Sequence, residues 1–99
     1  MTLYRTVESF RRGIVQNDEP FRKCYMVCAP LQSFLALLGW HTELVQGLCD
    51  GWEHYWLEFP DGRIVDPTAS QFNKPNGAKM PKIYIGRRPD WYKHEEEVK

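Results

Sequence analysis

Residues 54–68, with the sequence HYWLEFPDGRIVDPT, decide the fold that we predict for this chain. Residues 54–59 alternate between two sets of side chains, as expected for a strand that turns one face toward a core. Pro60, Asp61 and Gly62 suit a three-residue loop, because proline presets the first turn angle and glycine supplies the left-handed residue. A second strand follows the loop, so the stretch predicts an antiparallel hairpin.

The length of the loop sets which residues of this hairpin meet. A three-residue loop places Phe59 opposite Arg63, and therefore Trp56 opposite Asp66. Asp66 then shares a face with His54, one diagonal step away, and diagonal neighbours lie about 7–8 Å apart, within reach of an imidazole and a carboxylate. A two-residue Asp-Gly turn would move Asp66 to the other face. The predicted His54–Asp66 pair therefore depends on the three-residue loop.

Two helices are expected before the hairpin. Apolar residues at helical spacing predict an amphipathic helix over 3–15. A second helix should end at Gly39 and present one apolar face, formed by Leu31, Phe34, Leu35 and Leu38. Pro30 removes one backbone hydrogen bond from this helix, so the helix either kinks there or becomes regular only near Cys28. The sequence leaves these two possibilities open.

The rest of the chain predicts further strands and loops. Strands are expected at 42–46 and 82–85, a long loop over 69–81, and a charged, frayed tail over 93–99. Together with the helices, these elements predict a single α+β domain over residues 1–99. In it, the helix that starts near Cys24 packs on a small antiparallel sheet that contains the hairpin.

Composition narrows the class of protein. The 99 residues fit one domain, and the formal net charge of zero gives no bulk attraction to nucleic acid or to a membrane surface. No apolar stretch is long enough to span a membrane, and the N-terminus does not resemble a signal peptide. Three cysteines are an odd number, which together with the absent signal favours a reduced, cytoplasmic setting over a disulfide scaffold.

Three residues occur in an order that suits thiol catalysis. Cys24 lies where a loop enters the second helix, and His54 and Asp66 lie on the hairpin. A nucleophile at a helix start, facing a histidine and a carboxylate, is a workable site for acyl transfer. Two rivals remain at this stage. Cys28, one helical turn on, is an alternative nucleophile, and His41 is an alternative base.

These segments resemble the transglutaminase-like proteins of the wider papain-like fold. The resemblance covers residues 24–72 and is carried by Cys24 with Gly39, by His54-x-Trp56-x-Glu58, and by Asp66-Pro67-Thr68. The continuation through Phe72 resembles a group of small bacterial and phage proteins of this superfamily. Pro30, the second cysteine at position 28 and the short chain depart from the family pattern.

The resemblance implies a fold, an activity and roles for individual residues. The fold would be a minimal papain-like core, and the activity a thiol-dependent acyl transfer of amidase, peptidase, deamidase or transglutaminase type on a protein or peptide amide. Cys24 would be the nucleophile, His54 the base and Asp66 the acid that orients it. One oxyanion donor would be the backbone N–H of Cys24, and the second would be Gln16 or Asn17. Trp56 would exclude water, and no cofactor or metal would be needed.

Two other classes of function stay open. The first is a phage- or bacterium-encoded module on the same fold that binds or inhibits a host protein without catalysis. The second is a small zinc-stabilised module, although the spacing of the cysteines and histidines lacks the paired knuckles of structural zinc sites. A competent thiol site would differ from both by reacting rapidly with an alkylating agent at about pH 6, where an ordinary cysteine is mostly protonated.

Overall fold

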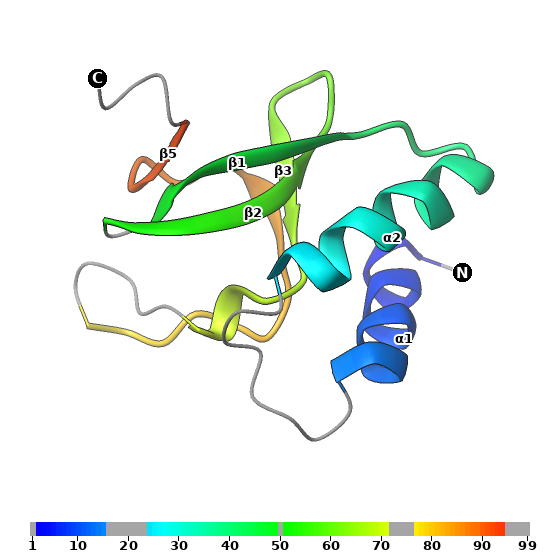
Figure 1. Cartoon of the computed structure of the whole chain (residues 1–99), viewed down its shortest axis with the longest axis horizontal. Helices are drawn as coiled ribbons and strands as arrows, with labels where there is room; N and C mark the ends of the chain where they lie inside the picture. Colours follow the sequence, from blue (N-terminus) through cyan, green and yellow to red (C-terminus); the bar gives the residue numbers. More distant parts are fainter. Residues whose placement is uncertain (1, 16–23, 50, 72–76, 95–99) are drawn as a thin grey trace.

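Two helices and a curled five-stranded antiparallel sheet form the protein, as seen in a computed structural model that describes residues 2–15, 24–49, 51–71 and 77–94 (Figure 1). The strands are ordered β4-β3-β2-β1-β5. The elements are α1 (Leu3–Val15), α2 (Cys24–Leu37), β1 (Glu43–Cys49), β2 (Trp52–Glu58), β3 (Arg63–Asp66), the 3-10 turn η1 (Ala69–Gln71), β4 (Tyr84–Arg87) and β5 (Tyr92–His94). The predicted α+β class is confirmed.

The helix ends follow from local sequence. Thr2 caps α1, because its hydroxyl accepts a hydrogen bond from the backbone N–H of Arg5 at 3.2 Å. Gly39 closes α2 with a positive φ of 94°. Its N–H donates to the carbonyl of Ala36, and the N–H of Trp40 donates to that of Leu35 at 2.9 Å. These two bonds satisfy carbonyls that a helix end otherwise leaves unpaired.

Pro30 does not interrupt the second helix. Regular helix begins at Cys24 and continues through Pro30, which lies on the exposed side. A proline inside a helix costs about 3 kcal/mol. Leu31 and Leu35 are fully buried just after it, and burying each such side chain contributes roughly 1.5–3 kcal/mol. Packing against the sheet therefore offsets the lost hydrogen bond.

The β2–β3 hairpin has the predicted three-residue loop. The N–H of Phe59 donates to the carbonyl of Arg63 at 2.8 Å, and the N–H of Gly62 donates back to the carbonyl of Phe59. Gly62 has a φ of 92°, the left-handed conformation that a glycine adopts without strain. Leu57 pairs with Val65, so the predicted register is confirmed and His54 and Asp66 share one face of the sheet.

Each face of the sheet buries its own cluster. The face toward α1 and α2 carries the helix-side core, which we define as Val7, Cys28, Leu31, Leu35, Leu57, Phe59, Val65 and Ile83. The opposite face carries the far-side core, defined as Cys49, Trp56, Ile64, Ala69, Met80 and Tyr92. The alternation in β2 produces this division, because neighbouring strand residues point to opposite faces.

Several predictions of the elements need correction. The strand near the end of the chain was missed: Tyr92–His94 form β5 beside β1, so Lys93 and His94 do not belong to a frayed tail. The expected loop contains η1, and β4 begins two residues later than the predicted strand at 82–85.

The predicted apolar face of α2 is only half buried. Phe34 and Leu38 are 38% and 52% exposed. The last turns of α2 extend beyond the strands in Figure 1, so only the earlier part of the helix packs on the sheet. Phe34 instead stacks on Phe10 of α1, with ring centroids 5.4 Å apart. In the part of the chain that the structure describes, no helix is long and apolar enough to cross a membrane.

Candidate functional site

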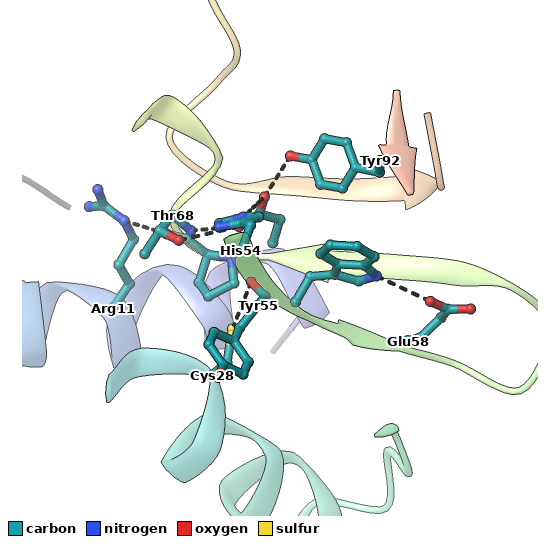
Figure 2. Close-up of polar contacts among 10 residues, drawn as sticks. Arg11, Cys28, His54, Tyr55, Glu58, Thr68 and Tyr92 are labelled. Atoms are coloured by element: carbon teal, nitrogen blue, oxygen red, sulfur yellow. Dashed lines mark hydrogen bonds and ion pairs between the residues drawn. The ribbon is translucent and has the colours of Figure 1, made fainter. Parts of the chain in front are cut away.

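A buried histidine–carboxylate pair lies on the far face of the hairpin (Figure 2). Nε2 of His54 is 2.7 Å from Oδ2 of Asp66, and both side chains are fully buried. An ionised carboxylate only accepts hydrogen bonds, so Nε2 carries the proton in this pair. The contact that the hairpin register predicts is therefore present. It fixes the tautomer of the ring and makes Nδ1 the nitrogen that is able to accept a proton.

The other oxygen of Asp66 is held by the segment that follows β3. The backbone N–H of Thr68 donates to Oδ1 at 3.0 Å, and the Thr68 hydroxyl lies 3.4 Å from the same atom. This is the local turn that an aspartate before proline favours. Asp66 thus forms a turn and also contacts His54, because its two oxygens point in different directions.

Helix α1 also forms a hydrogen bond to the segment that follows β3. Nε of Arg11 donates to the backbone carbonyl of Pro67 at 2.6 Å (Figure 2). The bond joins two segments that are far apart in sequence, and a hydrogen bond from a charged group is stronger than a neutral one. The position of the Asp66 carboxylate is therefore set by β3, by its own turn and by α1.

Tyr92 is a member of the site that the sequence did not predict. Its hydroxyl donates to Oδ2 of Asp66 at 2.5 Å, and the side chain is fully buried. Burial, together with the neighbouring Asp66 carboxylate, raises the pKa of Tyr92 above its ordinary value, so the phenol remains a donor. The only signal in the sequence was a short aromatic segment, Trp91-Tyr92. Such a segment is as typical of a packing cluster as of a functional site.

Aromatic rings enclose the histidine. The rings of Trp56 and Tyr92 lie 6.1 and 6.0 Å from that of His54, measured between centroids. Trp56 is fully buried, and its indole N–H donates to Glu58 at 3.1 Å. Nε2 of His94 lies 2.9 Å from the same oxygen of Glu58. The side chains of His54, Trp56 and Tyr92 are all fully buried, and the low dielectric of a protein interior strengthens the hydrogen bonds within it.

The three cysteines occupy different surroundings. Cys24 is the first residue of α2, but its side chain lies outside the described part of the structure. Cys28 is buried in the helix-side core, with Sγ 3.6 Å from the carbonyl oxygen of Tyr55 (Figure 2). His54 points to the opposite face of β2, so this geometry disfavours Cys28 as the partner of the histidine. Cys49 is buried in the far-side core.

The structure describes some of the remaining predicted residues and not others. Gln16 and Asn17 lie outside the described residues. The rival base His41 is exposed before β1 and lines a cleft with Glu43, Phe59 and Pro60. Within residues 2–15, 24–49, 51–71 and 77–94, no group of three or more His, Cys, Asp or Glu side chains is arranged to hold a metal ion. Comparisons of the chain with models of protein families, curated proteins and solved structures found no match.

Proposed function

We propose that this protein is a thiol-dependent acyl-transfer enzyme of the amidase, peptidase or deamidase type, built on a minimal transglutaminase-like or papain-like core. Cys24 is the nucleophile, His54 the base and Asp66 the residue that orients the base. The observation that carries the proposal is the buried hydrogen bond between His54 Nε2 and Asp66 Oδ2, 2.7 Å long. A base whose ring is fixed by a third group is the usual companion of a catalytic thiol.

The chemistry follows from the atoms available. Nδ1 of His54 takes the proton of the Cys24 thiol, and the Asp66 carboxylate stabilises the imidazolium that results. Cys24 opens α2, and the positive end of a helix dipole favours the thiolate. The thiolate attacks an amide carbonyl, and the imidazolium returns its proton to the leaving amine. Water, or an amine in a transglutaminase-like reaction, then cleaves the thioester and regenerates the thiol.

The proposal extends to the surroundings of the reaction. The backbone N–H of Cys24 is one donor to the oxyanion, and Gln16 or Asn17 is the second, by analogy with papain-like enzymes. Trp56 keeps water away from the imidazole. The substrate is an amide of a protein or peptide, which in a phage-type protein would belong to the host. A free thiol nucleophile fits a reducing, cytoplasmic setting. The mechanism requires no cofactor.

Alkylation of the thiols tests the proposal without knowledge of the substrate. We expect iodoacetamide to modify Cys24 at about pH 6 much faster than an ordinary cysteine, which is mostly protonated there. Peptide mass spectrometry resolves the three sites, and the buried Cys28 and Cys49 serve as internal controls. Cys28→Ala should leave the rate at Cys24 unchanged. If Cys24 reacts no faster in the folded protein than in the denatured chain, the proposal is wrong.

A second candidate function is a protein-binding module without catalysis. It is favoured by the apolar end of α2, where Leu37 and Leu38 are 86% and 52% exposed. Large exposed apolar side chains that lie together mark surfaces that partners cover. On this reading the His54–Asp66 pair only stabilises the fold, and Cys24 alkylates at an ordinary rate. The same experiment therefore separates the two candidates.

A further inference from the structure

Two strands deliver hydrogen-bond donors to one oxygen atom. Oδ2 of Asp66 accepts from Nε2 of His54 on β2 at 2.7 Å and from the hydroxyl of Tyr92 on β5 at 2.5 Å. The other oxygen, Oδ1, accepts from Thr68. A buried carboxylate with all of its sides occupied by donors is held in one orientation.

We propose that Tyr92 is a positioning residue of the site, and that β5 completes the site by docking on β1. The inference rests on the proposed function for its catalytic consequence. Tyr92 does not touch the reacting atoms. It acts through Asp66, because its hydroxyl fixes the plane of the carboxylate and draws part of the negative charge of Oδ2 away from His54. The imidazole is thereby oriented without being locked as imidazolium.

The tyrosine is held in place by its own strand. Tyr92 pairs with Cys49, and His94 pairs with Gly47, in the β1–β5 ladder. Tyr92 is the first residue of β5, and it also bonds the segment before the strand. Its N–H donates to the carbonyl of Pro89, and Arg88 donates to the carbonyl of Tyr92. Both backbone groups of Tyr92 are thus engaged, and the phenol has little freedom to leave Asp66.

Gly47 is what lets β5 approach. A Cβ atom at this position would lie 2.3 Å from the carbonyl oxygen of Lys93 on β5 and 2.3 Å from the ring of Trp56. Side chains do not tolerate such distances, so glycine is required for the indole ring and β5 to pack here together. Glycine at position 47 is therefore needed both for the packing of the far-side core and for placing the Tyr92 hydroxyl at Asp66.

The titratable and charged groups near His54 come from several elements. Asp66 on β3 bonds it directly, and the ring of Tyr92 on β5 lies edge-on to it with centroids 6.0 Å apart. Cys49 and Tyr84 lie near Tyr92, while Glu58 and His94 bond each other beside Trp56. Toward the helices, Cys28 contacts the carbonyl of Tyr55 and Arg11 bonds the carbonyl of Pro67. His54 and Tyr92 are the described residues that donate to Oδ2 of Asp66. Removing the Tyr92 hydroxyl therefore changes the set of donors on this atom.

Replacing the hydroxyl alone tests the inference. In Tyr92→Phe the ring remains to fill the core, but Oδ2 loses one donor and offers more of its charge to His54. We expect the pH at which the His54 ring loses its proton to rise by about one unit, because a lost hydrogen bond to a charged group is worth roughly that much. Carbon-13-labelled histidine followed by NMR measures this, and the protein has only 3 histidines to assign.

Matched variants separate this role from packing. Tyr84→Phe also removes a tyrosine hydroxyl, but one that donates to the carbonyl of Arg87, so it should leave the His54 titration unchanged. If Tyr92→Phe does not fold, difluorotyrosine in the wild-type chain supplies a more acidic donor at Oδ2 and should shift the titration the other way. A folded Tyr92→Phe protein with an unchanged His54 titration overturns the inference.

The outcome for the proposed function is read separately, at Cys24. If the inference and the function both hold, the alkaline side of the plot of Cys24 alkylation rate against pH shifts in Tyr92→Phe by as much as the His54 titration does. If the wild-type Cys24 shows no enhanced reactivity, the proposed enzyme fails, although the shift of His54 still establishes that Tyr92 positions Asp66. An unchanged alkylation profile beside a shifted His54 overturns the catalytic consequence alone.

Discussion

The helix-side core and the far-side core are buried to a similar degree but are held together by different forces. The helix-side core consists of Cys28 and of aliphatic and aromatic side chains from α1, α2, β2 and β3, with Phe59 and Ile83 from the segments that border β2 and β4. On the far side, aromatic rings surround a network of hydrogen bonds among His54, Asp66, Thr68 and Tyr92. The first face uses the hydrophobic effect, which has no direction, whereas the second depends on the geometry of individual donors and acceptors.

The difference bears on which face would carry the chemistry that we propose. An apolar core tolerates substitutions that conserve volume, usually at a cost below about 1.5 kcal/mol. A buried carboxylate and imidazole are costly unless every partner is present. The far face holds four polar partners where apolar side chains would suffice for stability, and this favours a role beyond packing.

The largest effect is expected at Asp66. If it orients His54, Asp66→Asn should fold yet reduce turnover by about 10⁴, since an amide permits the wrong tautomer and cannot stabilise imidazolium. Without a known substrate, the pH profile of Cys24 alkylation serves as the readout, and it should move upward. An unchanged profile in a folded Asp66→Asn protein would reduce the far-side network to a structural role.

Leu31 tests the opposite face. It is fully buried in the helix-side core, so Leu31→Ala should lower the free energy of unfolding by about 3 kcal/mol, through lost burial and a cavity. Urea denaturation measures this. Leu37→Ala on the same helix is the control, because Leu37 is largely exposed and should change stability by less than about 0.5 kcal/mol. Equal losses in the two variants would contradict the packing of α2 described above.

Gly47 tests the link between β5 and the far-side core. Gly47→Ala forces a Cβ atom against Trp56 and the backbone of Lys93, so it should destabilise the protein by about 1–3 kcal/mol, as overpacking does. It should also weaken the contact of Tyr92 with Asp66. The control is Gly13→Ala, since nothing lies within 4 Å of a Cβ there and alanine favours a helix by about 0.5–1 kcal/mol. A neutral Gly47→Ala would mean that β5 can dock without this close approach.

Asp61 should give the smallest effect. The hydrogen bond from the backbone N–H of Arg63 is the main cause that lowers the pKa of Asp61 below its ordinary value. A lowered pKa means that the carboxylate contributes stability above its ordinary pKa and loses it as the pH falls through the lowered one. Asp61 is exposed, so Asp61→Asn should shift the urea midpoint only slightly at about pH 7. It should cause no shift at about pH 2, where the Asp61 carboxyl is protonated and, like an asparagine amide, carries no charge. A large shift would show that the loop holds the hairpin register through charge.

Local rules in the sequence were enough for the hairpin and for half of the site. Pro60, Asp61 and Gly62 specify a three-residue loop by their own backbone preferences, and the loop fixes the register of β2 against β3. Once the register is fixed, His54 and Asp66 must share a face. The helix over 3–15 was equally predictable, because its apolar spacing is regular.

The missed features depend on contacts between distant segments. The three residues of β5 are too few to show a strand pattern, and they form a strand because the edge of β1 is available to them. The exposure of Phe34 and Leu38 follows from where α2 passes the edge of the sheet, which spacing along a helix does not reveal. Pro30 remains within α2 because packing on both sides of it outweighs the lost bond.

The sequence by itself therefore determined the α+β class, the hairpin register and the meeting of His54 with Asp66, because backbone preferences and side-chain alternation act over a few neighbouring residues. Only the tertiary structure decided that Tyr92 donates to the same oxygen as His54, that Arg11 fastens the turn at Pro67, and that Gly47 admits β5. These contacts join residues dozens of positions apart, and their geometry arises when the whole chain packs.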